Sequence, residues 1–520
     1  MPLEESGQDR ARTLILPRRR SLLRAGLALP GLALLGCAGA RAAEDPFSLG
    51  VASGEPGPDH VVLWTRLAPQ PRNGGGMAPD PVPVDWVVAR DPALRDVAQR
   101  GQATAVPEDA HSVHADIRGL EPDRPYWYRF TALGVASPVG RTRTAPRAGA
   151  MPASLRFAVA SCQQYEHGYF GAYRHMVAEE PDVVVFLGDY IYEASWGRNL
   201  VRHHDSPTAR DLEGYRDRYA LYKSDPDLQA AHAAAPWLVT WDDHEVSNDY
   251  ANDRGERERD EPFLARRAAA YKAFWEHMPL PESVRPRGAS ARIFRRADFG
   301  DLAAFHILDD RQYRDHQPCQ RPDRGGATRV RAGECAERDD PARSLLGLEQ
   351  ERWLRDGLAS SSARWNILAQ QTRMARLGGG DPPVYWTDGW DGYPAARRRL
   401  MDALTETRAR NPIVIGGDIH AHLVAELRPD FDRPETPPVA VEFTGTSITS
   451  QGGRYRETYP NEPHIAYANG DHRGYVTVAL TPGAAQAELR AVASVADRNT
   501  GISTLRRYRV ESGRSGLLPS

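Results

Sequence analysis

The feature that most constrains this chain is a short apolar segment that ends in a glycine and an aspartate. Residues 182–187 read Asp-Val-Val-Val-Phe-Leu, a nearly continuous β-branched run that predicts a strand buried on both faces. Gly188 breaks the run, so Asp189 lies at the carboxyl end of the strand, the edge where open α/β sheets bind their ligands. Tyr192 follows three residues later, near enough for its hydroxyl group to reach the same point.

Three further apolar segments end in side chains of related chemistry. Cys162 follows Arg-Phe-Ala-Val-Ala-Ser, Asp242 to Glu245 follow Trp-Leu-Val-Thr-Trp, and Asp418 and His420 follow Ile-Val-Ile-Gly-Gly. Four strands that end in carboxylate, thiol or imidazole groups indicate a metal centre. Single residues have ordinary alternatives: Asp189 as a helix cap, Cys162 as an apolar filler and Tyr192 as a core aromatic.

The first 43 residues have the pattern of an export signal. Three arginines at 18–20 precede Ser-Leu-Leu-Arg, a modestly hydrophobic stretch and then small residues. The twin arginines resemble a Tat signal, which exports folded proteins, and a Sec signal is the alternative. Cys37 in Leu-Leu-Gly-Cys is a candidate for lipidation, whereas Ala40-Arg41-Ala42 offers ordinary cleavage. We expect a bacterial periplasmic or secreted monomer that uses the Tat machinery and contacts a membrane only if Cys37 is lipidated.

Charge and cysteine content narrow the functional class. Lys and Arg number 66 against 69 Asp and Glu, a net charge of -3, which argues against a dedicated nucleic-acid partner. Beyond the amino terminus, no apolar run reaches the roughly 20 residues that a membrane helix needs. Cys319 and Cys335 flank a turn-rich segment and are expected to form a disulfide outside the cytoplasm. Cys162 then remains unpaired.

Strand and helix patterns divide the rest of the chain. Residues 45–145 contain short strand-like segments between Pro- and Gly-rich turns, which predicts a small all-β domain of fibronectin type III or Ig-like kind. Residues 154–500 mix β-α-β units with antiparallel runs, which predicts a two-sheet α/β (α+β) sandwich flanked by helices. Residues 501–520 are expected to form a carboxyl-terminal tail.

Four motifs occur in the order found in one enzyme family. They are Ser161-Cys162-Gln163, Gly188-Asp189-Tyr190-Ile191-Tyr192, Trp241-Asp242-Asp243-His244-Glu245 and Gly417-Asp418-Ile419-His420. Over about residues 45–500 the chain resembles the PhoD-type alkaline phosphatases, a branch of the calcineurin-like metallophosphoesterases. The resemblance implies a metallophosphatase sandwich and an exported enzyme that hydrolyses small phosphate esters with a metal-activated water. A phosphodiesterase acting on phospholipid or teichoic-acid-type diesters, and a non-catalytic metal-binding surface protein, remain alternatives.

The predicted ligands differ in chemical hardness. Asp189 is placed to bridge two cations. The thiolate of Cys162 and the phenolate of Tyr192 favour a trivalent transition metal, to which His420 adds a neutral nitrogen. Asp243 and Asp418 are hard oxygen donors suited to Ca²⁺. In the resembled family the site holds one Fe³⁺ and two Ca²⁺, and these positions match its ligands.

Other residues are candidates for supporting roles. His244 is expected to protonate the leaving group or bind phosphate, or else only to orient Asp243. Asp242 and Asn248 are expected to lie behind the ligands. Glu245, Asn248 and Asp249 are also candidates to complete a calcium shell, and a solvated turn is the alternative. The candidates for binding the phosphate anion are Arg266, Arg267 and Arg311, and for each the alternative is a structural ion pair.

Overall fold

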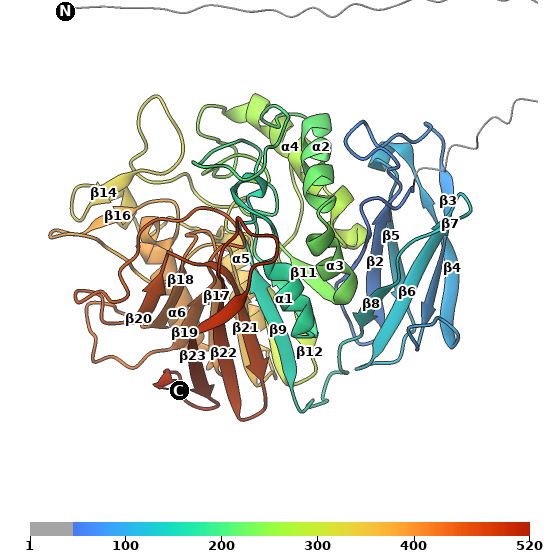
Figure 1. Cartoon of the computed structure of the whole chain (residues 1–520). Helices are drawn as coiled ribbons and strands as arrows, with labels where there is room; N and C mark the ends of the chain where they lie inside the picture. The colour runs from blue at the N-terminus through green and yellow to red at the C-terminus, as the bar shows by residue number, and fades with distance from the viewer. Residues whose placement is uncertain (1–44, 520) are drawn as a thin grey trace, which may run out of the picture. The chain divides into compact units, whose positions relative to one another are not determined.

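The computed structural model describes residues 45–519. The expected export signal and Cys37 lie outside these residues. Among the described residues, no helix combines the length and apolar character required to cross a bilayer. Two large sheets organise this part of the chain (Figure 1).

The first sheet has ten strands and contains the segment around Asp189. Its centre is parallel and is formed by β9 (Leu155–Ala160), β10 (Val183–Phe186) and β11 (Pro236–Val239). On one side follow β21 (Arg473–Leu480), β22 (Ala484–Val492), β23 (Ile502–Glu511) and β24 (Leu518–Pro519). On the other side follow β1 (Val51–Gly54), β2 (His60–Arg66) and β5 (Ser112–Arg118).

The second sheet has seven strands and packs on the first. Its parallel strands are β13 (Ala303–Ile307), β15 (Trp365–Ala369), β17 (Pro412–Gly416) and β19 (Ala440–Thr444). Its antiparallel strands are β12 (Arg295–Phe299), β18 (His422–Leu427) and β20 (Ile465–Asn469). The core between the sheets contains Phe157, Val185 and Phe305.

Helices cover the outer faces of the two sheets. The core on the outer face of the ten-stranded sheet includes residues of α1 (Ala172–Ala178), α2 (Leu212–Lys223), α3 (Pro226–Ala234) and α4 (Asp260–His277). The core on the outer face of the seven-stranded sheet includes residues of α5 (Leu348–Ala359) and α6 (Pro394–Glu406). In β10, Val184 belongs to the helix-covered core and Val185 to the core between the sheets. This confirms the prediction of a strand buried on both faces.

The all-β module predicted for residues 45–145 is present, but it does not stand apart from the rest. A sheet of its own contains β3 (Val82–Ala89), β4 (Val97–Ala105), β6 (Pro125–Ala132), β7 (Val135–Ala136) and β8 (Gly140–Arg143). Its remaining strands, β1, β2 and β5, extend the ten-stranded sheet. The junction is parallel, with Ser53 opposite Pro236. The module and the two-sheet part of the chain therefore share one continuous hydrogen-bonded sheet.

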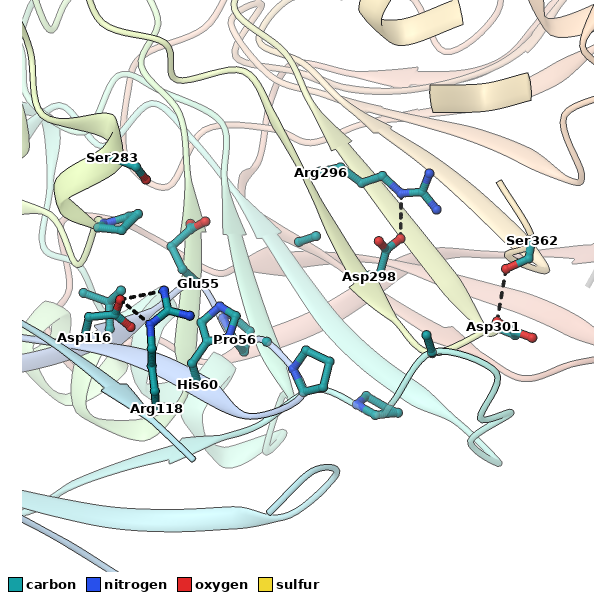
Figure 2. Close-up of a pocket in the computed structure, with 18 residues that line it drawn as sticks. Glu55, Pro56, His60, Asp116, Arg118, Ser283, Arg296, Asp298, Asp301 and Ser362 are labelled. Atoms are coloured by element: carbon teal, nitrogen blue, oxygen red, sulfur yellow. Dashed lines mark hydrogen bonds and ion pairs between the residues drawn. The ribbon is translucent and has the colours of Figure 1, made fainter. Parts of the chain in front are cut away.

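A cavity of about 500 Å³ lies between this module and β12 (Figure 2). Among the charged side chains that line it, Arg118 pairs with Asp116 and Arg296 with Asp298. None of the residues that line it belongs to the predicted metal centre. The cavity is therefore a feature of the domain junction.

The prediction of a tail after residue 500 is wrong, because β23 and β24 continue the ten-stranded sheet. Val510 of β23 is buried in the core between the sheets. The strand escaped notice because its sequence, Ile-Ser-Thr-Leu-Arg-Arg-Tyr-Arg-Val-Glu, is rich in arginine and most of it is only half-buried. Charges such as Arg507, which pairs with Glu488 of β22, are typical of strands near the edge of a sheet.

His306 of β13 is fully buried beneath α5. Its Nε2 lies 3.4 Å from Oδ1 of Asn366, and its ring contacts Trp353 edge-on. Burial, assisted by the positive charge of Arg296, lowers the pKa of His306 to about 4. The histidine is therefore neutral in the folded protein under ordinary conditions.

Deleting residues 501–520 should destabilise the protein, because β22 would lose its neighbour and the core would lose Val510. We expect the melting temperature to fall by about 4 °C or more, since 2 kcal/mol corresponds to roughly this shift in a large domain. The control Arg514→Ala changes a charge in the same segment without removing the strand. An unchanged melting temperature of the deletion variant would support the tail.

His306 should also make the protein less stable in acid. The unfolded chain takes up this proton near pH 6.5 and the folded chain only near pH 4, so stability falls as the pH drops through this window. The loss attributable to His306 approaches about 3 kcal/mol at pH 4. In urea titrations at pH 7 and pH 4.5, His306→Gln should therefore lose less unfolding free energy than the wild type. Equal losses would contradict this assignment.

Candidate metal centre

The carboxyl ends of the parallel strands of both sheets meet at one place. Cys162 follows β9 closely and Asp189 follows β10, and the backbone N–H of Cys162 donates to the carbonyl of Gly188 at 3.1 Å. The two sheets are tied together here, since Oγ1 of Thr240 donates to the carbonyl of Leu308 at 3.0 Å. Asp418 and His420 enter from the end of β17 in the second sheet.

The first group of candidate ligands is the one expected from the strand ends. One ligand atom each of Cys162, Asp189 and His420 lie within 4.8 Å of one another. Tyr192 joins them: its Oη lies 2.8 Å from Oδ2 of Asp189 and 3.1 Å from Nε2 of His420. The structure thus brings a thiol, a carboxylate, a phenol and an imidazole to one point.

Two further groups continue from the first. Asp189, Asp243 and His244 form the second group, and Asp243, Asp249 and Asp388 form the third. Asp189 is shared by the first two groups and Asp243 by the last two, so the three groups form a connected series. Asp418 lies beside this series: its Oδ1 is 3.6 Å from Nη2 of Arg311, which is in turn 3.8 Å from Oδ2 of Asp243.

The backbone at these strand ends is held in a demanding conformation. Cys162, Asp189, Asp418 and His420 all have positive φ angles, between 53° and 62°, which side-chain-bearing residues rarely adopt. Such strain persists only where the surrounding contacts impose it, and it concentrates at functional sites. Gly188 has a φ of 100°, and a Cβ atom there would lie 2.4 Å from the backbone nitrogen of Asp242. Only glycine lets these two strand ends approach so closely.

Glu245 is a brace for this backbone. Its carboxylate accepts hydrogen bonds from the backbone N–H groups of Asp189 (3.0 Å), Tyr190 (2.6 Å) and Asp242 (2.8 Å). Both of its oxygens are therefore engaged away from the candidate ligand groups. This position favours a structural role over membership of a calcium shell.

The site concentrates negative charge away from water. Burial raises the pKa of Asp189, Asp242 and Asp249 well above the usual value, and the pKa of Asp418 to about 7. For Asp243 the same burial is outweighed by the positive charges of Arg311 and His244, which hold its pKa below the usual value. The positive side chains in the site therefore do not neutralise all of its carboxylates, and bound cations would complete the balance.

His420 is oriented as a ligand of a cation would be. Its Nδ1 donates to the carbonyl of Gln451 at 2.7 Å, because a carbonyl oxygen can only accept. The free lone pair of the neutral ring is then on Nε2, which faces Tyr192 and Asp189. Burial lowers the pKa of His420 to about 3, so the ring stays neutral. Fixing one ring nitrogen by a backbone carbonyl is the usual arrangement of metal-binding histidines.

His244 is held by an acidic partner that the sequence patterns did not reveal. Nδ1 of His244 lies 2.6 Å from Oε2 of Glu193, and the other carboxylate oxygen of Glu193 accepts from the backbone N–H of Asn248 at 3.0 Å. Burial would lower the pKa of His244, but Glu193, Asp243 and Asp189 together raise it well above the usual value. The backbone N–H of Asn248 thus contacts the acidic partner of His244.

The three arginines predicted to bind phosphate are all engaged inside the protein. Arg311 is fully buried and forms ion pairs with Asp242 and, at 2.8 Å, with Asp388. Arg266 donates to Tyr215 and the carbonyl of Ala209, and Arg267 to the carbonyls of Asn252 and Ala289. These contacts favour structural roles for all three. Arg311 neutralises part of the negative charge of the acidic residues.

Asp388 is absent from the residues predicted from the sequence, whereas Asp249 is among the candidates for a calcium shell. Asp388 follows the short strand β16 (Val384–Trp386), whose pairing with β14 (Arg329–Arg331) leaves no long apolar run in the sequence. Asp249 lies in a turn, and its backbone N–H donates to Oδ2 of Asp243 at 2.6 Å. An aspartate in a polar loop carries no local signal of this kind.

The donor set fits bound metal ions. Sulfur, phenol and imidazole lie at one end of the series, and the third group consists of carboxylates alone. The first end suits a transition metal and the other end a hard cation such as Ca²⁺ or Mg²⁺. The pair Cys319–Cys335 lies apart from these groups and forms the predicted disulfide, with an S–S distance of 2.02 Å.

Comparisons with known proteins agree with this architecture. The family model described as "PhoD-like phosphatase" matches residues 157–489, and "PhoD-like phosphatase, N-terminal domain" matches residues 34–146.

Individual relatives match over nearly the whole chain. The chain is 45% identical over 488 residues to "Alkaline phosphatase D" of Bacillus subtilis (strain 168), which covers 91% of this chain and 82% of that protein. It also matches the solved "Structure of PhoD" at 45% identity and a TM-score of 0.87, with 92% of each chain covered. The chain therefore belongs to the PhoD-like phosphatase family.

Proposed function

We propose that this protein is an exported, metal-dependent alkaline phosphatase that hydrolyses small phosphate esters. The observation that carries the proposal is the connected series of ligand groups from Cys162 to Asp388, joined through Asp189 and Asp243. Two or more cations held close together by shared carboxylates suit the hydrolysis of a phosphate ester. The identity with alkaline phosphatase D supports the same reaction.

We assign the metal ions by the chemistry of their ligands. Fe³⁺ would be held by Cys162, Asp189, Tyr192 and His420, because thiolate and phenolate are strongly donating anions. Two Ca²⁺ would be held by the hard oxygens of Asp189, Asp243 and Asp418, and Asp249 and Asp388, which share a group with Asp243, would join this shell. Asp242 forms the closest of the carboxylate pairs with Arg311, and we place it outside this shell.

The chain contributes proton transfer and positioning. Bound cations would neutralise the oxygens of the phosphate and lower the pKa of a water molecule that attacks it. His244 is the general acid: its Nδ1 is engaged by Glu193, so Nε2 is the atom that donates a proton to the leaving alkoxide. Glu193 fixes the ring and stabilises its protonated form. Tyr192, whose ring centroid is 4.1 Å from that of His244, limits its movement.

Export through the Tat machinery fits this chemistry, because Tat carries folded proteins and allows the ions to bind before transport. Residues 1–43 carry the signal in this proposal, and the enzyme works in the periplasm or outside the cell.

Asp189→Asn should abolish the shared ligand between the first two groups. We expect activity to fall by more than about 100-fold, beyond the 10- to 100-fold typical of residues that only orient a ligand. Elemental analysis should show loss of iron, with loss of the visible absorption that an iron–phenolate pair produces. Asp116→Asn, in the distant amino-terminal module, is the control. Full activity with full metal content in Asp189→Asn would rule out the proposed centre.

His244→Asn should slow esters according to their leaving groups. An alkyl phosphate needs a proton on its departing oxygen, so we expect its turnover to fall by about 100-fold or more. Turnover of p-nitrophenyl phosphate, whose leaving group is stable as an anion, should fall far less. Glu193→Gln should show the same pattern more weakly, and His60→Asn is the control. Equal losses for both esters would assign His244 to phosphate binding or to orienting Asp243.

A further inference from the structure

Two cavities open beside the acidic series and meet at the same two residues. The first, of about 720 Å³, is lined by Asn248 and Asp249 and reaches Arg329 and Trp386. The second, of about 710 Å³, is lined by Asp418 and also reaches Arg329 and Trp386. Arg329 and Trp386 therefore stand where both cavities pass the candidate metal centre.

Trp386 is presented to solvent by a rigid support. It lies on the two-stranded ribbon β14–β16, labelled in Figure 1, and 45% of its surface is exposed. Its neighbour Tyr385 is buried with Val330 and Cys335 of the disulfide, which anchors the opposite side of the ribbon. An exposed tryptophan on an anchored ribbon is a surface for stacking rather than part of a core.

The ribbon is joined directly to the metal centre. Thr387 donates its backbone N–H to the carbonyl of Thr328 at 3.0 Å, and the next residue is Asp388 of the third ligand group. Oδ1 of Asp388 accepts from Nε2 of Gln317 at 2.9 Å. Trp386 is therefore held two residues from a candidate ligand, beside the third ligand group.

Two arginine side chains of the described residues line the second cavity without an acidic partner. Among the described residues, neither Arg329 nor Arg454 forms a side-chain ion pair or hydrogen bond, and both are exposed. The guanidinium of Arg329 lies 6.0 Å from the centre of the Trp386 ring. Arg454 follows Gln451, whose carbonyl orients His420. Tyr455 and Tyr459 add further rings to the same wall.

We propose that this wall binds the alcohol part of the substrate. Trp386 stacks on a planar ring, and Arg329 and Arg454 bind an additional negative charge. The wall thus selects phosphate esters of nucleoside type that carry a second phosphate, over esters of small polyols. The proposal rests on the phosphatase function, because the cavities lead to the phosphate only if it binds at Asp243 and Asp418. Aromatic stacking and guanidinium contacts are the usual means of holding a nucleobase and its phosphates.

Steady-state kinetics on three esters test the proposal in the metal-replete enzyme. All three esters carry a phosphate that can be hydrolysed. Adenosine 3′,5′-bisphosphate also has a base and a second phosphate, adenosine 5′-monophosphate has the base but no second phosphate, and glycerol 2-phosphate has neither a base nor a second phosphate. Trp386→Ala should lower kcat/KM for both adenosine esters about tenfold relative to glycerol 2-phosphate, mainly through KM. Arg454→Ala and Arg329→Ala should lower the ratio of bisphosphate to monophosphate about fivefold, and less at high salt.

Controls separate recognition from folding. Arg456→Ala removes another exposed arginine of the same loop that does not line the cavity, and it should leave all ratios unchanged. Trp386→Phe keeps a ring and should restore most of the preference for adenosine esters. Unchanged ratios in Trp386→Ala and in both arginine variants would overturn the proposal.

A binding measurement distinguishes this proposal from the proposed function. Calorimetry with adenosine 3′,5′-bisphosphate should show weaker binding to Trp386→Ala than to the wild type. If the wild type hydrolyses none of the esters but binding still depends on Trp386, the phosphatase proposal fails and the binding wall stands. If all esters are hydrolysed and binding is independent of Trp386, the wall is overturned and the phosphatase function stands.

Discussion

Negative charge held away from water, where two sheets meet, is the constraint on which the rest of the structure depends. Asp189, Asp243 and Asp388 would repel one another if nothing compensated for them, and burial makes that repulsion stronger. The positive charge of Arg311 offsets part of this repulsion through its ion pairs with Asp242 and Asp388. The negative charge that Arg311 does not neutralise must be held in place by the fold. The strand ends therefore adopt strained backbone conformations, and both carboxylate oxygens of Glu245 accept hydrogen bonds from them. Such an arrangement is stable when cations complete it.

Positioning in this site comes from the backbone as much as from side chains. Gly188 permits the close approach of β10 and β11, and the carbonyl of Gln451 selects the ring nitrogen that His420 offers. Glu193 does the same for His244. Because a second residue fixes each of these two histidines, the fold sets the orientation of both rings. The ribbon that carries Trp386 extends this order to the substrate side, through Asp388.

Residues next to buried strands could be predicted from the sequence, and residues in polar loops could not. The runs before Cys162, Asp189 and Asp418 are apolar and end abruptly, so both the strands and their terminal groups were visible. Glu193 and Asp388 act through contacts with residues distant in the sequence, and acidic side chains in turns are ordinary. Asp249, which lies in a turn, could be named only as an alternative between a calcium shell and a solvated turn. The strand β23 was hidden for a related reason, since an arginine-rich strand next to the edge lacks the alternation that marks a half-buried strand. Pairing of β1 with β11 is likewise non-local and leaves no pattern in either segment.

The ten-stranded sheet pairs strands that are far apart in the sequence, such as β1 with β11, and this affects folding during synthesis. The ten-stranded sheet takes strands from near both ends of the described chain, β1 to β2 at one extreme and β22 to β24 at the other. During synthesis, β9 to β11 leave the ribosome well before β21 to β24, so β9 keeps an open edge until the later strands are made. High contact order of this kind slows folding and exposes nascent sheet to aggregation. Folding of the ten-stranded sheet is thus coupled to the synthesis of nearly all the described residues.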